Sequence, residues 1–436
     1  MSVVQSFGEL VQSVSGVMSA PTFVSFVTVL TGWLFCQRHT VTAMIVAAGE
    51  RARKHHSAYH RVFASAQWSL DELGLAVATL VLPWLGPGTV FVAIDDTLAR
   101  KRGLKIFGVG MHHDPLLSTR KTALMNWGHS WVILGLIVRF PFHPHRYFCL
   151  PMLFRLYRSQ QTVRRQGGAY RTRPELAVEM LHVLCSRFCQ RQFHVVADSA
   201  YGGQSVHRHL PKNCDLTSRI CLKARLYDAA PARRAGQNGR PRKRGQLLPT
   251  PQQMLTQRGT RVTLNVYGRR DRVRLVEAIA HLYASPERAV RVVVVQPLSG
   301  GRSVQAFYST CASATAVEIL GWYARRWSIE QAFQESKMHL GFEQPQGWTR
   351  RAVERTAPTA MLLYSLVVLW FADWGHRRWQ RPQRSWYPKK RWPAFADMLA
   401  ALRWQSWRQE VLHRVVPPHG SQKPLLELLN SLKCAA

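Results

Sequence analysis

The amino-acid sequence predicts an α/β protein in which a β-sheet is flanked by helices and interrupted by a β-rich insertion. Three observations support this class. Short apolar runs that lead into acidic residues are separated by helical segments in the middle of the chain. A helical region precedes them, and several strand-like segments follow one another between two helix-rich parts. Apolar residues make up 47% of the 436 residues, which is enough for a packed core.

The chain is strongly basic. It contains 59 Lys and Arg residues against 24 Asp and Glu residues, which gives a formal net charge of +35. A positive balance can serve solubility or attract an anionic membrane surface, but a charge this dense indicates a polyanionic partner, chiefly nucleic acid. The length favours two or three domains over a disordered basic tail protein.

Residues 1–86 are predicted to form a helical, DNA-binding region. Within them, the uncharged segment 17–36 is long enough to cross a bilayer, but it contains Pro21 and several hydroxyl side chains, so we expect a buried helix. The basic, histidine-rich segment 49–63 fits a helix that contacts phosphates. A solvated helix surface explains the same pattern equally well.

Two short strands are predicted to lead into acidic residues. The first, 88–97, is β-branched and aromatic, follows a glycine turn and ends in Asp95 and Asp96. The second, 193–203, is a hydrophobic run that leads directly into Asp198 and then into glycines. Acidic residues at strand ends commonly build an active site at the edge of a sheet.

These strands belong to a predicted first part of the core, residues 87–210. Segments 104–113 and 130–140 are further strand candidates, and the second is apolar enough for the interior of a sheet. Residues 174–192 are predicted to be a helix, because a proline and a glutamate, both favoured in a first turn, open the segment.

Residues 211–312 are predicted to form the β-rich insertion. It contains a basic loop at 229–251, which is rich in Gly, Pro and Arg and cannot hold a core. The strands predicted after this loop are 260–268, 288–298 and 303–310.

The core is predicted to resume at residues 313–375. A capping box at 315–318 begins a long helix, and the apolar segment 359–374 is short for a bilayer span and fits a core helix. The C-terminal region, 376–436, mixes tryptophans with cations at 376–395. Such a mixture can stack on bases, although packing of a helical cap explains it at least as well.

The helix after the capping box carries four polar side chains on one face. Tyr323, Arg326, Glu330 and Lys337 are spaced by three, four and seven residues, which places them within roughly 60° of one another on a helical wheel. On spacing alone, a solvated face with helical ion pairs is an equal alternative.

Asp198 and Glu330, together with Asp95 or Asp96, form a candidate catalytic group. Three acids that meet at the edge of a sheet repel one another unless cations lie between them, and carboxylate oxygens suit Mg²⁺ or Mn²⁺. With two ions, one would activate water or a 3′ hydroxyl and the other would stabilise the leaving oxygen of a phosphoryl displacement. Successive strand side chains point to opposite faces, so only one of Asp95 and Asp96 is expected to reach the site.

Eight cysteines are present, and none forms a C-x-x-C pair. Cys185 and Cys189 lie near His182 and His194, but no second ligand pair has zinc spacing, so buried, reduced thiols are the preferred interpretation. The sequence shows no signal-peptide pattern at its start. We therefore expect a cytoplasmic protein.

The order of strand aspartate, strand aspartate and helix glutamate, with Y-x-x-R-x-x-x-E-x-x-x-x-x-x-K around the last, resembles the DDE transposases of bacterial insertion sequences. It is similar to the group with the tyrosine, arginine, glutamate and lysine signature. "IDDTLARKRG", residues 94–103, resembles the first aspartate segment in part of that group, and "VVADSAYGG" resembles its second aspartate strand. The resemblance covers about residues 88–375.

The resemblance implies an RNase H-like catalytic core with a mixed sheet, a β-rich insertion and helical N-terminal and C-terminal regions. It also implies that Asp198, Glu330 and one acid of the first strand are catalytic and hold two Mg²⁺ or Mn²⁺ ions. The family places the first acid two positions before a Thr or Ser. This selects Asp95, before Thr97, and leaves Asp96 in a turn or around the site.

The residues implied to contact DNA phosphates are Tyr323, Arg326, Lys337 and Lys101, with Lys105 beside them. Arginine suits bidentate phosphate recognition, whereas lysine acts as a mobile point charge. For Lys101 and Lys105, a solvated position is an equal alternative.

The activity implied by the resemblance is that of a DNA transposase, which cleaves transposon ends and transfers them to target DNA, with the excised end resolved through a hairpin. The implied partners are double-stranded DNA and a second copy of the chain, with no membrane, in the nucleoid of a bacterial cytoplasm. Two alternatives stand beside it. A catalytically inactive, transposase-derived DNA-binding protein would lack an acid, yet all three are present. A membrane protein with a basic cytosolic face would be absent from a high-salt soluble fraction.

Overall fold

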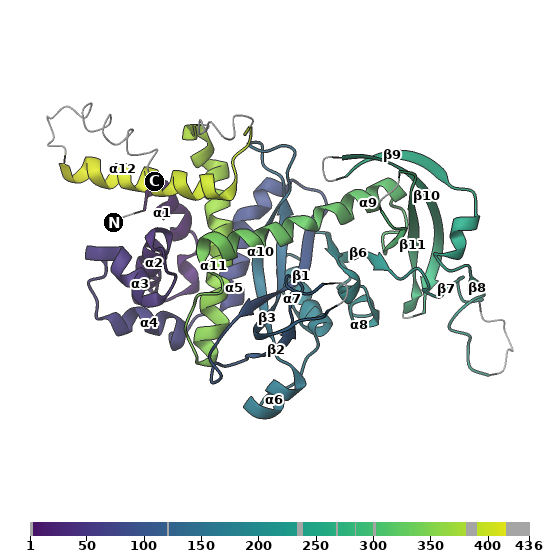
Figure 1. Ribbon diagram of the computed structural model, residues 1–436, viewed down its shortest axis with the longest axis horizontal. Helices are drawn as coiled ribbons and strands as arrows, with labels where there is room; N and C mark the ends of the chain where they lie inside the picture. Colours follow the sequence, from purple (N-terminus) through teal and green to yellow (C-terminus); the bar gives the residue numbers. More distant parts are fainter. Residues whose placement is uncertain are drawn as a thin grey trace.

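The computed structural model describes residues 3–119, 122–232, 239–266, 269–283, 285–299, 302–380 and 390–415. In these residues a group of N-terminal helices packs beside a twelve-stranded sheet (Figure 1). The sheet is mixed, because β1, β5 and β6 run parallel to one another while the other pairs are antiparallel. The predicted α/β class, an RNase H-like mixed sheet flanked by helices, is confirmed.

The N-terminal residues are helical, as the predicted fold class required. The helices are α1 (Gln5–Gln12), α2 (Ala20–Phe35), α3 (Val41–Ala48), α4 (His56–Ala64) and α5 (Leu70–Val81), followed by a 3₁₀ helix (Leu82–Leu85). Helix α2 covers most of the uncharged segment 17–36, and its Val29 and Trp33 are completely buried. The expectation of a buried helix in this segment is therefore confirmed.

The first part of the sheet and its helices follow. The elements are β1 (Val90–Arg100), β2 (Gly110–His113), β3 (Met125–Val138), β4 (Phe148–Tyr157), α6 (Gln160–Gln166), α7 (Arg173–Arg187), β5 (Phe193–Ala197), α8 (Gln204–His207) and β6 (Cys214–Ile220). The segment 104–113 is a strand only in its last four residues. The helix predicted for 174–192 ends at Arg187.

Strand β1 continues past the two adjacent aspartates. The expectation that Asp95 and Asp96 end this strand is wrong, because β3 pairs with β1 from Val92 to Arg100 and holds the later residues in the same ladder. The two acids therefore lie in the middle of a paired strand. Their side chains are fixed by the pleat rather than by a loop.

The β-rich segment extends the same sheet. Its elements are β7 (Leu226–Tyr227), β8 (Leu247–Leu248), β9 (Thr260–Val266), β10 (Arg269–Leu282), β11 (Ser285–Pro297) and β12 (Gln305–Ser309). The strand order is β2-β3-β1-β5-β6-β12-β11-β10-β7-β8, with β4 beside β3 and β9 beside β10. In the predicted basic loop, 229–251, the part that the structure describes contains only the short strand β8; residues 233–238 lie outside the described residues.

The long helix predicted after residue 315 is two helices that follow each other closely, α9 (Ala316–Arg325) and α10 (Trp327–Leu340). Thr315 and Glu318 form the expected capping box. The break is at Arg326, where the backbone stays helical but tightens, since its N–H donates to the carbonyl of Tyr323 and its carbonyl accepts from the N–H of Ile329. Figure 1 shows α9 and α10 nearly in line across the molecule.

Helix α11 (Arg350–Asp373) is the buried core helix expected for segment 359–374. It is the one helix in the described part of the chain that is long and apolar enough to cross a membrane. However, 94% of its apolar window is buried inside the protein, which is the behaviour of a core helix. The chain then continues to α12 (Phe395–Val415); residues 381–389 of the tryptophan-rich segment 376–395 lie outside the described residues.

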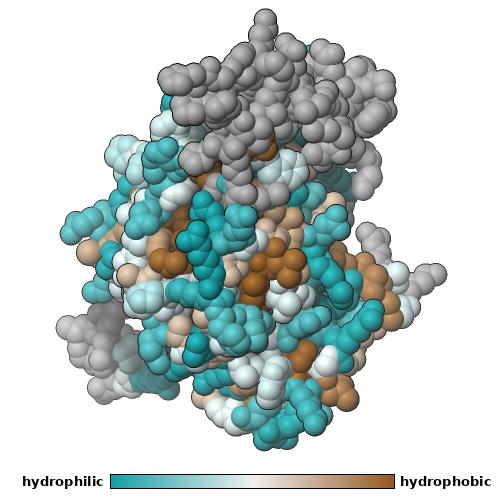
Figure 2. Space-filling view, turned by 90° about the vertical axis from the view of Figure 1, so that its left-hand side faces the viewer, coloured by the Kyte–Doolittle hydropathy of each residue, from teal (hydrophilic) through white to brown (hydrophobic). Residues whose placement is uncertain are grey.

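The N-terminal helices pack against the last elements of the chain. The Trp33 indole N–H donates to the carbonyl of Leu340 at 2.9 Å, and the buried Arg355 donates to the carbonyls of Ala66 and Trp68 at 2.7 and 2.6 Å. On this side of the molecule the surface is mainly hydrophilic, with small separate hydrophobic patches (Figure 2). The N-terminal helices thus share one core with α10 and α11.

Helix α5 approaches strand β4 so closely that only glycine fits at position 74. A Cβ at Gly74 would lie 1.9 Å from the carbonyl oxygen of Met152. We expect Gly74→Ala to destabilise the protein by about 1–3 kcal/mol, because the backbone of β4 must shift. Gly321→Ala is the matched control in α9, where nothing lies within 4 Å. There the loss of glycine should stabilise the helix by about 0.5–1 kcal/mol. In urea unfolding, the two substitutions should change the free energy of unfolding in opposite directions. Equal changes would contradict the close approach of α5 to β4.

Candidate active site

Asp95 and Asp198 lie side by side on neighbouring parallel strands. In the β1–β5 pair, Ile94 is in register with Ala197, so the next residues along the two strands are Asp95 and Asp198. Residues in register on parallel strands point to the same face of a sheet. The two carboxylates therefore share one face at the end of β5.

The turn that carries Asp198 is held on several sides. Asp198 caps the 3₁₀ helix Ser199–Tyr201, and its Oδ1 accepts from the N–H of Ala200 at 2.9 Å. Its carbonyl accepts from the Ser218 hydroxyl at 2.8 Å, and the carbonyl of Gly202 accepts from the Tyr308 hydroxyl at 2.7 Å. Strands β6 and β12 thus fix the position of this acid.

The adjacent residues Asp95 and Asp96 have different partners on opposite faces of β1. Asp95 Oδ2 accepts from Arg326 Nη1 at 2.5 Å. Asp96 Oδ1 accepts from the Tyr201 hydroxyl at 2.9 Å, and its Oδ2 is 3.3 Å from Nε of Arg173 in α7. The alternation along the strand favours Asp95 as the acid that faces α10. Its role as a metal ligand stays a prediction.

Arg326 joins Asp95 to Glu330. Its Nη2 donates to Glu330 Oε1 at 2.6 Å, while its Nη1 binds Asp95, so one guanidinium separates the two carboxylates. The side chain of Arg326 is only 15% exposed. Its Nε has no hydrogen-bond partner among the described residues. The structure thus places Asp95 beside Asp198 on the sheet and joins Asp95 to Glu330 through Arg326.

The charges at this site are strongly coupled. Burial, followed by the nearby carboxylates of Asp198 and Asp96, raises the pKa of Asp95 to about 7, although Arg326 acts to lower it. Burial also raises the pKa of Asp96, against the lowering effects of Arg173 and Tyr201. Burial acts to lower the pKa of Arg326, but Asp95, Tyr323 and Glu330 outweigh it and raise that pKa. Negative charge here therefore depends on cationic partners.

The other two residues of the predicted signature, Tyr323 and Lys337, contact other parts of the protein itself. Tyr323 is 8% exposed, and its ring centroid lies 4.7 Å from that of Phe307 in β12. Lys337 donates to the carbonyl of Leu98 at 2.7 Å and lies 3.4 Å from Glu343. Helix α10 is therefore tied to β1 near both of its ends, by Arg326 and by Lys337. Contact of Tyr323, Arg326 or Lys337 with DNA stays a prediction.

Lys101 is not placed as a free surface cation. Its ammonium donates to the carbonyls of Glu343 and Pro345 at 2.8 and 2.9 Å, and burial lowers its pKa to about 8. In this arrangement Lys101 holds the loop after α10 against the end of β1. The expected phosphate contact through Lys101 would require these two hydrogen bonds to break.

Sequence reasoning did not identify the partners of Asp96. Tyr201 lies three residues after Asp198, in the segment that resembles the second aspartate strand of the family. The sequence therefore placed Tyr201 near the site but gave no sign that it binds Asp96. Arg173 had no local signal, because it reaches Asp96 from α7 and also donates to Ser130 Oγ at 3.0 Å. These contacts hold Asp96 on the face of the sheet away from Glu330.

The donor chemistry of the site fits a hard divalent cation, since its acids offer only carboxylate oxygens. In the described residues, no group of three or more His, Cys, Asp and Glu side chains is arranged to hold a metal ion as it stands. The geometry gives the reason, because the guanidinium of Arg326 already occupies the space between Asp95 and Glu330. Asp95 and Glu330 are therefore already paired with the positive charge of Arg326.

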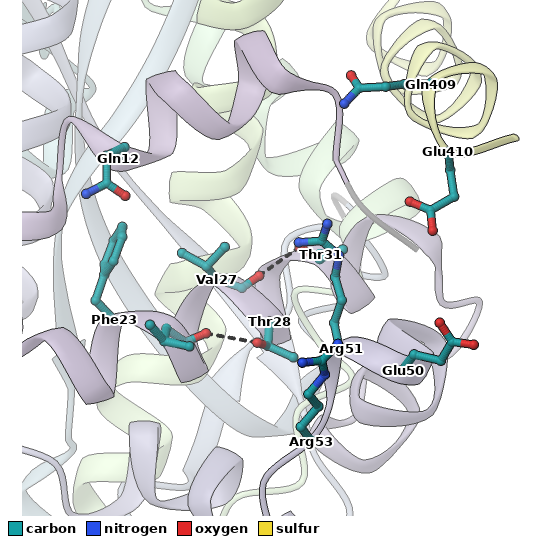
Figure 3. A pocket seen from close by; sticks show the side chains of 11 residues that line it. Gln12, Phe23, Val27, Thr28, Thr31, Glu50, Arg51, Arg53, Gln409 and Glu410 are labelled. Atoms are coloured by element: carbon teal, nitrogen blue, oxygen red, sulfur yellow. Dashed lines mark hydrogen bonds between the residues drawn. The ribbon is translucent and has the colours of Figure 1, made fainter. Parts of the chain in front are cut away.

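A separate groove of about 820 Å³ lies in the N-terminal region, away from these acids. Its walls come from α1, α2, the residues after α3, and α12 (Figure 3). Arg51 and Arg53, from the basic segment 49–63, line it beside Thr28 and Val27. Phosphate contact by this segment stays a prediction.

Comparison with protein families identifies the family of this chain. A family model described as DDE superfamily endonuclease matches residues 18–277, which is more than half of the chain. The match includes Asp95 and Asp198 and ends before Glu330, so the position of the third acid beside them comes from the fold. No curated protein matches the chain.

Proposed function

Because the chain belongs to the DDE superfamily of endonucleases, we propose that it is a transposase that cleaves the ends of a mobile DNA element and joins them to target DNA. Membership of this family makes DNA the substrate class. The observation that supports the finer proposal is the meeting of Asp95, Asp198 and Glu330, which are distant in sequence, at one face of the sheet.

In this proposal, Asp95, Asp198 and Glu330 hold two Mg²⁺ or Mn²⁺ ions. Such ions supply an activated water or 3′ hydroxyl and stabilise the leaving oxygen of a phosphoryl displacement. The chain's own residues position the acids. Lys337 and Lys101 hold α10 and the loop after it against β1, and Ser218 holds the turn at Asp198.

The proposal extends to the nucleic acid. Arg326 and Lys337 contact phosphates of the element end, with Tyr323 beside them, after leaving their present partners. The reaction is cut-and-paste with a hairpin at the excised end, it is carried out by a dimer on double-stranded DNA, and it takes place in the bacterial cytoplasm at the nucleoid. These steps rest on the resemblance of the signature residues.

The experiment uses a supercoiled plasmid that carries the DNA flanking this gene in its source genome. Purified full-length protein with Mg²⁺ should release the fragment between the two flanks, and a matched plasmid with shuffled flanks should remain intact. Denaturing gels of the excised ends would show hairpins as strands of double length. Equal cutting of the two plasmids would contradict a transposase and leave only a general endonuclease.

The net charge predicts a strong salt dependence of DNA binding. With a formal charge of +35, we expect each DNA end to neutralise about six to ten phosphates. The logarithm of the binding constant should then fall with the logarithm of salt concentration with a slope of roughly −5 to −9. Fluorescence anisotropy of a labelled duplex between about 0.1 and 0.4 M NaCl, around the physiological range, measures the slope. A flat response would exclude binding driven by phosphate contacts.

A further inference from the structure

The candidate active site contains its own cation. The guanidinium of Arg326 binds Asp95 at 2.5 Å and Glu330 at 2.6 Å, and it is largely shielded from water. A guanidinium that bridges two carboxylates reduces their mutual repulsion, with one positive charge where a divalent ion would bring two. Residues that a phosphoryl-transfer enzyme would use for metal are thus paired with an arginine.

Two details indicate that this guanidinium is not permanently anchored. Its Nε, although buried, has no hydrogen-bond partner among the described residues, so the hydrogen bonds seen for this group are those to Asp95 and Glu330, with the Tyr323 ring centroid 5.7 Å from the guanidinium carbon. It also lies at the junction of α9 and α10, where the regular hydrogen-bond pattern changes. A side chain held chiefly by the two acids can leave when the acids find another positive charge.

We infer that Arg326 is a built-in counter-cation, which occupies the space between Asp95 and Glu330 in the free protein and which a divalent cation must displace from at least one of them in order to bind. This inference rests on the proposed function. A divalent cation and a guanidinium repel each other and compete for the same carboxylate oxygens. Arg326 therefore lowers the affinity of the free protein for the cation while it keeps the acids close together.

The test measures binding of Mn²⁺ alone to the full-length protein, from the electron paramagnetic resonance signal of free Mn²⁺. Removing the competing charge with Arg326→Gln should tighten Mn²⁺ binding by about tenfold or more. The matched control is Arg325→Gln, which removes the same charge one residue away. The guanidinium of Arg325 lies over the rings of Phe91 and Tyr147, at 4.2 and 4.9 Å from their centroids, and not between carboxylates, so this variant should bind Mn²⁺ within about twofold of wild type.

A double variant, Arg326→Gln with Glu330→Gln, assigns the binding to this site, because the gain in affinity should disappear. Unchanged or weaker Mn²⁺ binding by Arg326→Gln, or a gain that survives in the double variant, would overturn the inference and leave the proposed function standing. If wild type and all variants fail to bind Mn²⁺, the metal-dependent function fails together with the inference.

A second measurement needs no variant and so does not depend on the folding of Arg326→Gln. In crystals of the wild-type protein soaked with Mn²⁺, the guanidinium of Arg326 should have left Asp95 or Glu330. A structure in which Mn²⁺ binds Asp95 while Arg326 keeps both of its present contacts would overturn the inference.

Discussion

Glu330→Gln is expected to abolish cleavage of DNA while leaving DNA binding intact. The amide has the shape of the carboxylate and its oxygen can still accept from Arg326, so α10 should keep its place. The lost negative charge, however, removes a ligand that the proposed reaction requires. Residues that act as a unit are each nearly indispensable, and we expect a loss on the order of 10³-fold or more in cleavage rate. Asp198→Asn should behave in the same way.

The control for this prediction is Glu335→Gln on the same helix. Glu335 faces His339 at 3.3 Å rather than the aspartates, and its replacement should change cleavage little. Cleavage is measured on end-containing DNA, binding by anisotropy, and folding by thermal melting. Wild-type cleavage by Glu330→Gln or Asp198→Asn would exclude these acids from the chemistry, and inactivity of Glu335→Gln would show that any charge change in α10 is harmful.

Arg155→Met is expected to be among the most destabilising single substitutions in the protein. Arg155 in β4 binds both oxygens of Asp71 at 2.7 Å, and its Nε binds Glu179 at 2.8 Å. It is 16% exposed and joins α5 and α7 to the sheet. Removing it leaves Asp71 without its cation and Glu179 with only the exposed Arg171, and breaking a buried pair in this way typically costs about 3–5 kcal/mol. Chemical denaturation with far-ultraviolet circular dichroism measures the free energy of unfolding.

Arg171→Met is the matched control, since Arg171 also pairs with Glu179 but is 54% exposed. An exposed pair of this kind is worth about 0–1 kcal/mol, so the two variants should differ several-fold in their effect. Similar losses in the two would show that Glu179, and not the buried position of Arg155, determines the cost. In that case Glu179→Gln alone should cause most of the loss in the free energy of unfolding.

Local patterns in the sequence predicted the main features of the site, because these features depend on residues that are close together in the sequence. A hydrophobic run before Asp198 and a capping box before α9 are short-range signals, and both elements are found where expected. Asp95 and Asp198 come together because β1 and β5 are parallel and in register, which follows once the strands are recognised.

The features that were missed depend on contacts between distant segments. The sequence of β10 is charged and rich in helix-forming residues, so it does not predict a strand. Its pairing with β9 and β11 makes it one. Strand β4 contains Pro151, which argues against a central strand; the fold accommodates it at a register shift against β3. The bond from Arg326 to Asp95 spans 231 residues, so spacing along a helix could not reveal it. Of the four side chains predicted on one helix face, Arg326 and Lys337 bind β1, and Tyr323 packs against Phe307 in β12.

The packing of the N-terminal helices on α10, α11 and α12 has a consequence for biosynthesis. The partner of Trp33 is 307 residues further along the chain, and the carbonyl of Leu34 accepts from Arg403 Nε. On the ribosome, the first helices therefore emerge long before the surfaces that bury them, and an expressed fragment such as 1–86 would expose its apolar faces. These helices can therefore reach their final packing only after α10 and α12 have been synthesised.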